Sequence, residues 1–236
     1  MIKPQKLKIG DSVALVSLSS GLIGESYFMH KYNLAQKRLK EKFGLNLIAM
    51  PNSLKGIDYL YNHPEKRAED FMDAFKDPNI NGIICAIGGD DTIRLLPYIN
   101  FEVIRNNPKV FLGYSDTTIN HFMMYKAGVT SYYGPNIMCD FAEYGDMFEY
   151  TEDAIKDLLF SGNSNYEMKK CSYWVDEFIS WDEQNINKFK ERLPDELGHE
   201  VVQGKGIITR KINWRMYRCF PYANWNKPLA FSNRME

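Results

Sequence analysis

The sequence predicts an α/β fold, with a Rossmann-like, mainly parallel sheet in its N-terminal domain. Apolar runs alternate with stretches of helical periodicity over the first 160 residues, and this alternation is typical of a parallel sheet covered by helices on both faces. The chain has 236 residues, of which 44% are hydrophobic, so it is long enough to bury a substantial core. Its formal net charge of −1 gives no sign of binding to nucleic acid or to a membrane surface.

The predicted strands are apolar runs bounded by glycine, proline or polar residues. They cover residues 12–17, 45–50, 81–87, 110–114 and 129–134. Apolar residues at helical spacing predict helices over residues 27–43, 64–77, 117–127 and 151–160. Gly44 marks the end of the first helix and Pro64 the start of the second, because glycine favours the turn after a helix and proline fits its first position.

The composition divides the chain into three parts. Residues 1–160 form the predicted N-terminal α/β domain. Residues 161–209 are polar with short aromatic stretches, and we expect them to hold a linker and the start of a second, truncated α/β domain. Residues 210–236 carry six basic residues and one acid, an abrupt change that marks them as an aberrant tail.

Cysteine usage and hydropathy indicate a protein of the cytoplasm. The four cysteines lie far apart without a C-x-x-C pair, which argues against a disulfide framework and against a zinc site. The apolar run after Asp11 is too short for a signal peptide and predicts a buried strand. No stretch approaches the roughly 20 apolar residues that a membrane span needs.

The first motif with chemical potential is AIGGDDTIRLL, residues 86–96. A strand runs into Gly88 and Gly89, then into Asp90 and Asp91 and a predicted helix. Glycines let backbone N–H groups approach a ligand, and a helix N-terminus favours negative charge. The motif therefore suits a phosphate or an oxyanion. The alternative is a structural turn in which Asp90 or Asp91 caps the helix.

The second motif is GYSDTT, residues 113–118. It matches the first three positions of the nucleophile elbow G-x-S-x-G, in which a sharp turn exposes a serine above a sheet. Asp116 stands where that pattern has its second glycine. The alternative is that Ser115 or Asp116 only caps the helix that follows.

The two motifs are expected to meet, because the carboxyl ends of parallel strands share one edge of a sheet and ligands bind there. Backbone N–H groups of Gly89 and Asp116 would then form an oxyanion hole beside Ser115. A single such donor lowers the activation barrier by roughly 3 kcal/mol.

A nucleophilic serine needs a base, and no histidine stands in an obvious motif. His121 follows Ser115 by six residues, which places it about 240° around the helix, facing away, as a core or boundary histidine. His30 lies in the first predicted helix and His63 in a loop. Sequence alone leaves His63 and His199 open, because triad members can be far apart in the chain.

The motifs and their surroundings resemble the serine peptidases of the LD-carboxypeptidase family, and most of all the branch of the microcin C immunity proteins. The matching stretches are IGGDDTIRLLPYINFEVIRNNPKVFLGYSDTT, YYGPNIMCDFAE and EVVQGKGIIT, within a resemblance over about residues 3–209. It implies that Ser115 is the nucleophile, that Gly89 and Asp116 supply oxyanion-hole amides, and that Gly88, Asp90 and Asp91 contact substrate.

The resemblance also implies a reaction and an assembly. Family members cleave amide bonds next to a free carboxylate, in small peptides or, in this branch, in peptidyl- or aminoacyl-nucleotides. They need no metal or cofactor and are usually homodimers. From its charge, we expect this chain to bind neither nucleic acid nor a membrane.

The C-terminal part departs from the family. The family's Glu and His, which complete a Ser-Glu-His triad, follow a turn that reads roughly T-G-K-L-I-G-G-C. Here GKGIIT is present, but the residues after it do not resemble the family. In one allowed set of codons for residues 210–225, reading from the second base gives G-K-L-I-G-G-C-I-D-V-F-P-M-L-I, the family's continuation.

We therefore expect residues 210–236 to be a frameshifted tail. The chain would then lack its Glu and His and be nearly inactive, with apolar surface exposed near residues 161–209. A basic arm that binds nucleic acid or a partner is the alternative.

Two other functions compete with a peptidase. The GGDDT loop is similar to the GGDGT loop of NAD and diacylglycerol kinases, although Asp91 adds a charge where a phosphate must fit. A non-catalytic protein that keeps the pocket would bind ligand without turnover. Binding of ATP or NAD would favour the kinase-like interpretation, and covalent labelling of Ser115 would favour the peptidase scaffold.

Overall fold

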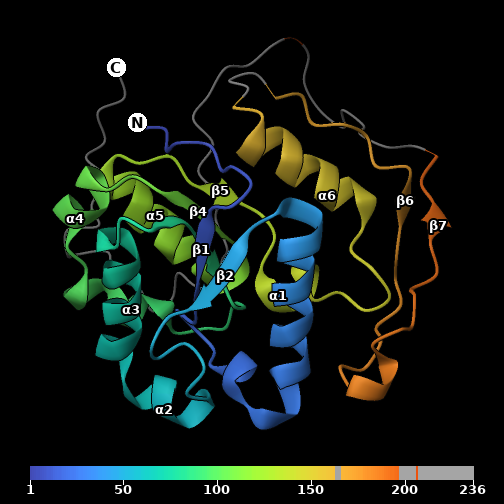
Figure 1. Ribbon diagram of the computed structural model, residues 1–236, viewed down its shortest axis with the longest axis horizontal. Helices are drawn as coiled ribbons and strands as arrows, with labels where there is room; N and C mark the ends of the chain where they lie inside the picture. Colours follow the sequence, from blue (N-terminus) through green and yellow to red (C-terminus); the bar gives the residue numbers. More distant parts are fainter. Residues whose placement is uncertain (163–165, 197–205, 207–236) are drawn as a thin grey trace.

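The computed structural model describes residues 1–162, 166–196 and 206, and its centre is a five-stranded parallel sheet (Figure 1). The strand order is β2-β1-β3-β4-β5, and every neighbouring pair is parallel. The strands are β1 Ser12–Val16, β2 Asn46–Ala49, β3 Ile80–Cys85, β4 Val110–Gly113 and β5 Tyr132–Tyr133. The predicted α/β class with a mainly parallel sheet is confirmed.

The core lies on both faces of the sheet, because side chains alternate along each strand. In β1, Val13 and Leu15 belong to the core under α1, whereas Ala14 and Val16 belong to the core under α3 and α5. All four are completely buried. The strands are therefore apolar on both sides, as a two-sided parallel sheet requires.

Six α-helices surround the sheet in the described residues (Figure 1). They are α1 Met29–Phe43, α2 Ile57–Asn62, α3 Pro64–Lys76, α4 Phe101–Asn106, α5 Thr118–Ala127 and α6 Glu149–Ile155. The end of α1 at Gly44 follows the prediction, with the glycine in the left-handed region at φ 66°. Pro64 occupies the first turn of α3, also as predicted.

Several elements differ from the sequence prediction. The segment after Asp91 is a 3-10 helix, Thr92–Tyr98, with Pro97 inside it, because proline cannot donate the hydrogen bond that a longer α-helix needs. Strand β5, predicted over residues 129–134, has only two residues. Helices α2 and α4 were not predicted, although α4 has a clear signal: the Asn100 side chain caps two of its first N–H groups.

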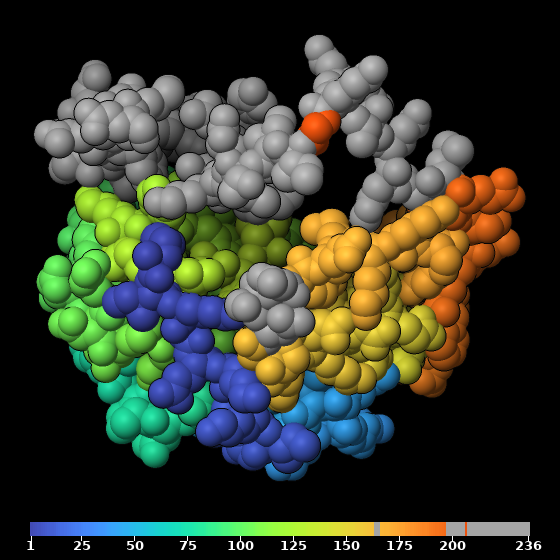
Figure 2. Space-filling view, turned by 90° about the horizontal axis from the view of Figure 1, so that it is seen from above, coloured from blue at the N-terminus to red at the C-terminus, as the bar shows by residue number. Residues whose placement is uncertain are grey.

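The chain after α6 packs beside the first domain. Strands β6 Tyr173–Trp174 and β7 Leu193–Pro194 form a short antiparallel pair, and Figure 2 shows this part of the chain, in orange, against the yellow residues near α6. Large apolar side chains are exposed here, as expected for residues 161–209: Met168, Trp174, Phe178 and Phe189. The predicted tail, 210–236, lies outside the described residues.

Candidate active site

Ser115 sits on a sharp turn between β4 and α5. It is the one non-glycine residue with positive φ in the described part of the chain, at 64°. A residue with a Cβ atom pays roughly 1–2 kcal/mol for the left-handed region, so the surrounding fold must hold this conformation. Such strain at the end of a strand is the geometry of a nucleophile elbow.

Backbone contacts of Ser115 hold the elbow. Its N–H donates to the Tyr133 hydroxyl oxygen at 3.2 Å, and its carbonyl accepts from Thr118 Oγ1 at 2.5 Å. The Ser115 carbonyl also accepts from the Thr118 backbone N–H. These hydrogen bonds all use the backbone of Ser115, and its hydroxyl has no hydrogen-bond partner among the described residues. Tyr133 was not singled out from the sequence, because nothing in a two-residue strand marks it.

The structure brings the two glycines of the first motif against the elbow. A Cβ atom on Gly88 would lie 2.7 Å from Cβ and 2.8 Å from Oγ of Ser115, and 3.3 Å from the Asp116 nitrogen. On Gly89, a Cβ atom would overlap the Ser19 hydroxyl. Positions 88 and 89 therefore have room only for glycine, and the backbone of the turn lies directly against the Ser115 hydroxyl.

The Asp116 side chain joins the ends of three strands. Its Oδ2 accepts a hydrogen bond from Ser19 Oγ at 2.6 Å and another from the Thr92 N–H at 2.9 Å. Asp116 is only 1% exposed. Its buried carboxylate therefore holds the loops of the site in place. This role is additional to the oxyanion-hole donor predicted for its backbone N–H.

The two aspartates of the first motif have different surroundings. The Asp91 carboxylate accepts from Arg67 Nη1 at 2.7 Å, from Arg67 Nη2 at 3.0 Å and from Arg94 Nη1 at 3.0 Å. Asp90 is exposed. The side chain of Asp91 thus has a structural partner set, and Asp90 is the aspartate of this turn that is open to solvent.

His121 does not act on Ser115. Its Nε2 lies 2.9 Å from the Gly113 carbonyl and its Nδ1 2.7 Å from Ser131 Oγ. Because a carbonyl only accepts, Nε2 carries the proton and Nδ1 accepts from the serine. Burial lowers the pKa of His121 to about 4, so the ring is neutral and fully engaged, as expected for a core histidine.

The other described histidines are also engaged elsewhere. His30 Nε2 lies 2.6 Å from the Tyr144 hydroxyl, and His63 Nδ1 lies 2.8 Å from Glu65 Oε1. His199 lies outside the described residues. No histidine of the described part of the chain contacts Ser115.

Comparison with protein families decides where this site belongs. Residues 13–134, which carry both motifs, match the model of the LD-carboxypeptidase N-terminal domain (Peptidase S66). The chain belongs to the LD-carboxypeptidase family. The predicted family is thereby confirmed.

Relatives place this LD-carboxypeptidase family member in the MccF-like branch. The Microcin C7 self-immunity protein MccF of Escherichia coli is 30% identical over 208 residues, which cover 85% of this chain and 59% of the relative. The chain spans about 60% of the length of the curated relatives it matches.

Solved structures show the same fold. An MccF-like protein from Streptococcus pneumoniae, in complex with AMP, is 39% identical with a TM-score of 0.73, over 79% of this chain and 55% of that one. An MccF-like protein from Bacillus anthracis is 30% identical with a TM-score of 0.70, over 84% and 57%. MccF has also been solved with aspartyl sulfamoyl adenosine, at 25% identity and a TM-score of 0.71, over 83% and 58%.

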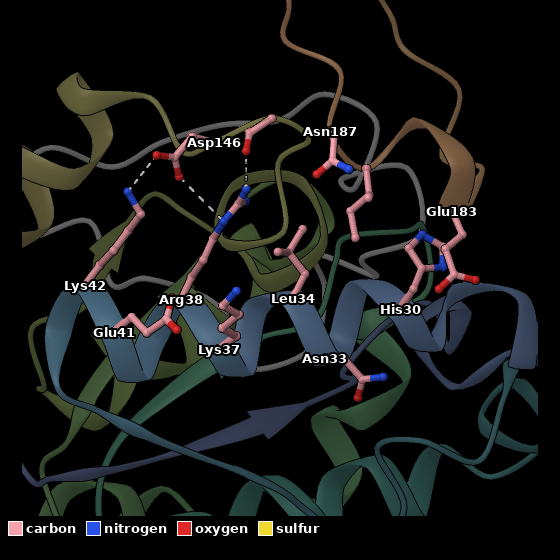
Figure 3. A pocket seen from close by; sticks show the side chains of 12 residues that line it. His30, Asn33, Leu34, Lys37, Arg38, Glu41, Lys42, Asp146, Glu183 and Asn187 are labelled. Atoms are coloured by element: carbon pink, nitrogen blue, oxygen red, sulfur yellow. Dashed lines mark hydrogen bonds and ion pairs between the residues drawn. The ribbon is translucent and has the colours of Figure 1, made fainter.

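A groove of about 540 Å³ runs along α1 of this family member, away from the two motifs (Figure 3). Three of its charged side chains form ion pairs with one another: Asp146 lies 3.6 Å from Arg38 Nε and 3.0 Å from Lys42 Nζ. None of the predicted site residues lines it. The groove therefore has no part in the chemistry of Ser115.

An apolar cavity of about 360 Å³ lies beside the elbow, between β5 and α6. Tyrosines dominate its wall, and Asp140 is its acidic residue. Burial raises the pKa of Asp140 to about 6 and also raises the pKa of Tyr114, the residue before the nucleophile.

Residues 1–162, 166–196 and 206 have neither a metal cluster nor a membrane-spanning helix. There, no group of three His, Cys, Asp or Glu side chains is arranged to hold a metal ion. None of the helices in these ranges combines the length and the apolar character needed to cross a membrane. Cys85, Cys139 and Cys171 are free thiols.

Proposed function

We propose that this chain carries the nucleophile domain of a serine carboxypeptidase. The observation that supports this most is Ser115, held at φ 64°, whose hydroxyl lies against the glycine turn and has no hydrogen-bond partner among the described residues. Its Oγ would attack the carbonyl carbon of an amide bond, and the N–H groups of Gly89 and Asp116 would stabilise the oxyanion. The C–N bond breaks as the acyl-enzyme ester forms, and the proton of the Ser115 hydroxyl goes to the leaving amine. Water then hydrolyses the ester to a free carboxylate and restores the hydroxyl.

The Ser115 N–H does not belong to this proposed oxyanion hole. It already donates to the Tyr133 hydroxyl, so the donor after the nucleophile is the Asp116 N–H, as in other nucleophile elbows. Gly89 would supply the second donor from the neighbouring strand end.

The proposed substrates are peptides with a free carboxylate, or peptidyl- and aminoacyl-nucleotides. MccF-like proteins have been solved with AMP, and MccF with aspartyl sulfamoyl adenosine and glutamyl sulfamoyl guanosine. These ligands support an aminoacyl-nucleotide over a plain peptide. Gly88, Asp90 and Asp91 remain the proposed substrate-binding turn, with Asp90 the side chain open to a ligand, and a homodimer remains the proposed assembly.

We further propose that the 236-residue polypeptide turns over slowly. The described histidines are engaged away from Ser115, so none of them serves as its base. A serine hydrolase without its base keeps only the rate enhancement of its oxyanion hole and binding, roughly 10³–10⁴ over water.

The test is hydrolysis of aspartyl sulfamoyl adenosine, followed as released aspartate by mass spectrometry, with Ser115→Ala as control. Slow release that disappears in Ser115→Ala is the expected result. Release at an enzyme-like rate overturns the proposed impairment. Binding without Ser115-dependent release favours the non-catalytic alternative, and binding of ATP or NAD instead favours the kinase-like one.

A further inference from the structure

Arg67 is a buried cation that contacts the loops next to the proposed active site. It lies on α3 with its side chain completely buried, and it is one of the largest fully buried residues of the protein. Its Nη1 donates to the carbonyls of Leu18 at 3.2 Å and Ser19 at 3.0 Å, and both Nη atoms donate to Asp91. Its Nε has no partner among the described residues.

These contacts connect two loops at the carboxyl ends of neighbouring strands. Leu18 and Ser19 follow β1, and Asp91 follows β3. The same loops also touch each other directly, since the Ser20 N–H donates to the Gly88 carbonyl at 3.2 Å. Arg67 thus ties together both sides of the Gly88–Gly89 turn from the side of α3.

Asp116 ties the same two loops from the other side. Ser19 is held through its carbonyl by Arg67 and through its hydroxyl by Asp116. The loop after β3 is held at Asp91 by Arg67 and at the Thr92 N–H by Asp116. Because each loop is held at two points by buried, charged side chains, the peptide groups of these loops have little freedom to rotate.

We propose that Arg67 is a positioning residue: it fixes the Gly88–Gly89 turn so that the Gly89 N–H faces the Ser115 hydroxyl. This proposal rests on the oxyanion-hole role proposed above for Gly89. It also accounts for the burial of a full charge that the core does not need for apolar packing, since buried ionic groups can specify one arrangement.

Arg94 offers a matched control. It pairs with the same Asp91 carboxylate at 3.0 Å, but its side chain is 38% exposed. Its other side-chain contacts are with Tyr61, through a hydrogen bond to the carbonyl and a cation–π contact with the ring. Replacing Arg94 removes a counter-charge of Asp91 and leaves the Ser19 carbonyl untouched. A difference between the two arginines therefore reports positioning rather than charge.

The experiment compares Arg67→Lys, Asp91→Asn and Arg94→Met in the full chain. Lysine keeps the charge, but its three donors on one nitrogen cannot replace all four hydrogen bonds of Arg67, which include the bidentate pair with Asp91. Hydrogen–deuterium exchange of residues 17–21 and 86–92 should rise about tenfold in Arg67→Lys and Asp91→Asn, and stay within about twofold in Arg94→Met. Unchanged exchange in Arg67→Lys, or an equal rise in Arg94→Met, overturns the proposal.

A fluorophosphonate probe supplies the second measurement. The maximal rate of Ser115 labelling should fall about tenfold in Arg67→Lys, with the half-saturating probe concentration unchanged, because the lost interaction acts in the transition state. An unchanged rate beside increased exchange overturns the positioning role. If the unmodified chain labels no more than Ser115→Ala, the proposed function fails instead, and exchange alone decides whether Arg67 holds the turn.

Discussion

Ser19 Oγ lies 2.6 Å from Asp116 Oδ2, and this hydrogen bond joins residues that are 97 positions apart in the chain. Both side chains are buried, at 3% and 1% exposure. The same carboxylate oxygen also accepts the Thr92 N–H. One oxygen atom therefore fixes the relative positions of the loops after β1, β3 and β4, on which all the proposed site residues lie.

Asp116→Ala should reduce the free energy of unfolding by about 3 kcal/mol. The substitution leaves a buried hydroxyl and a buried N–H without their acceptor, and each unsatisfied group costs roughly 1–3 kcal/mol. Urea denaturation followed by circular dichroism gives the value. Asp90→Ala is the control, because Asp90 is exposed and should change stability by less than about 0.5 kcal/mol. Equal values for the two variants would contradict the structural role of Asp116.

Gly88→Ala should destabilise the protein and block the elbow. The added methyl group would lie 2.7 Å from Ser115 Cβ, and forcing such an overlap typically costs about 1–3 kcal/mol. Gly134→Ala is the matched control, since its nearest neighbour would be Leu112 Cδ1 at 4.0 Å. Thermal unfolding and probe labelling of both variants test this, and a Gly88→Ala protein that labels normally would mean that the turn lies farther from Ser115.

Ser115→Gly should be about 1 kcal/mol more stable than Ser115→Ala. Both variants lose the hydroxyl, but only glycine occupies the left-handed region without steric cost. Comparing the two replacements cancels the loss of the nucleophile. It leaves the backbone strain, less the extra conformational entropy that glycine loses on folding. Equal urea midpoints, or a more stable alanine variant, would show that the backbone at this position is relaxed.

His121 should make the protein less stable in acid. Burial lowers its pKa from 6.5 to about 4, so the unfolded state binds more protons between these two values. The contribution of the neutral ring is complete above pH 6.5 and is lost as pH falls towards 4, up to about 3 kcal/mol in all.

The test is the stability difference between the unmodified chain and His121→Gln, measured by urea denaturation from pH 7.5 to 4.5. Asp140, whose pKa burial raises to about 6, contributes to the pH dependence of stability with the opposite sign in the same range. Its contribution is present in both proteins, so subtracting one stability from the other removes it. A difference that stays constant with pH would rule out the buried neutral ring.

The sequence was informative where the signal is local. Apolar runs revealed β1, β3 and β4, and the glycines and Ser115 at their ends marked the strand-end turns. Tyr133, Ser19 and Arg67 were missed because their roles depend on contacts between loops that are distant in the chain. The Asp116 carboxylate was missed for the same reason, since nothing near it in sequence shows that Ser19 will be its partner.

The position of the base could not be predicted either. Helical geometry correctly turned His121 away from Ser115, but a triad partner is chosen by the fold and not by spacing. The 3-10 helix after Asp91 was predicted as an ordinary helix because both kinds of helix begin with the same residues. The residue that limits its length, Pro97, lies inside the helix and not at its start.

The hydrogen bonds of the Asp116 carboxylate, which form a hub between three loops, restrict which insertions and deletions these loops can accept during evolution. One residue inserted between β1 and Ser19, or between β3 and Thr92, would carry that loop's donor away from the shared oxygen by one residue length, roughly 3 Å. The three loops therefore cannot lengthen or shorten independently. Insertions and deletions should be tolerated where the chain leaves this hub, such as the exposed loop ends on the opposite edge of the sheet.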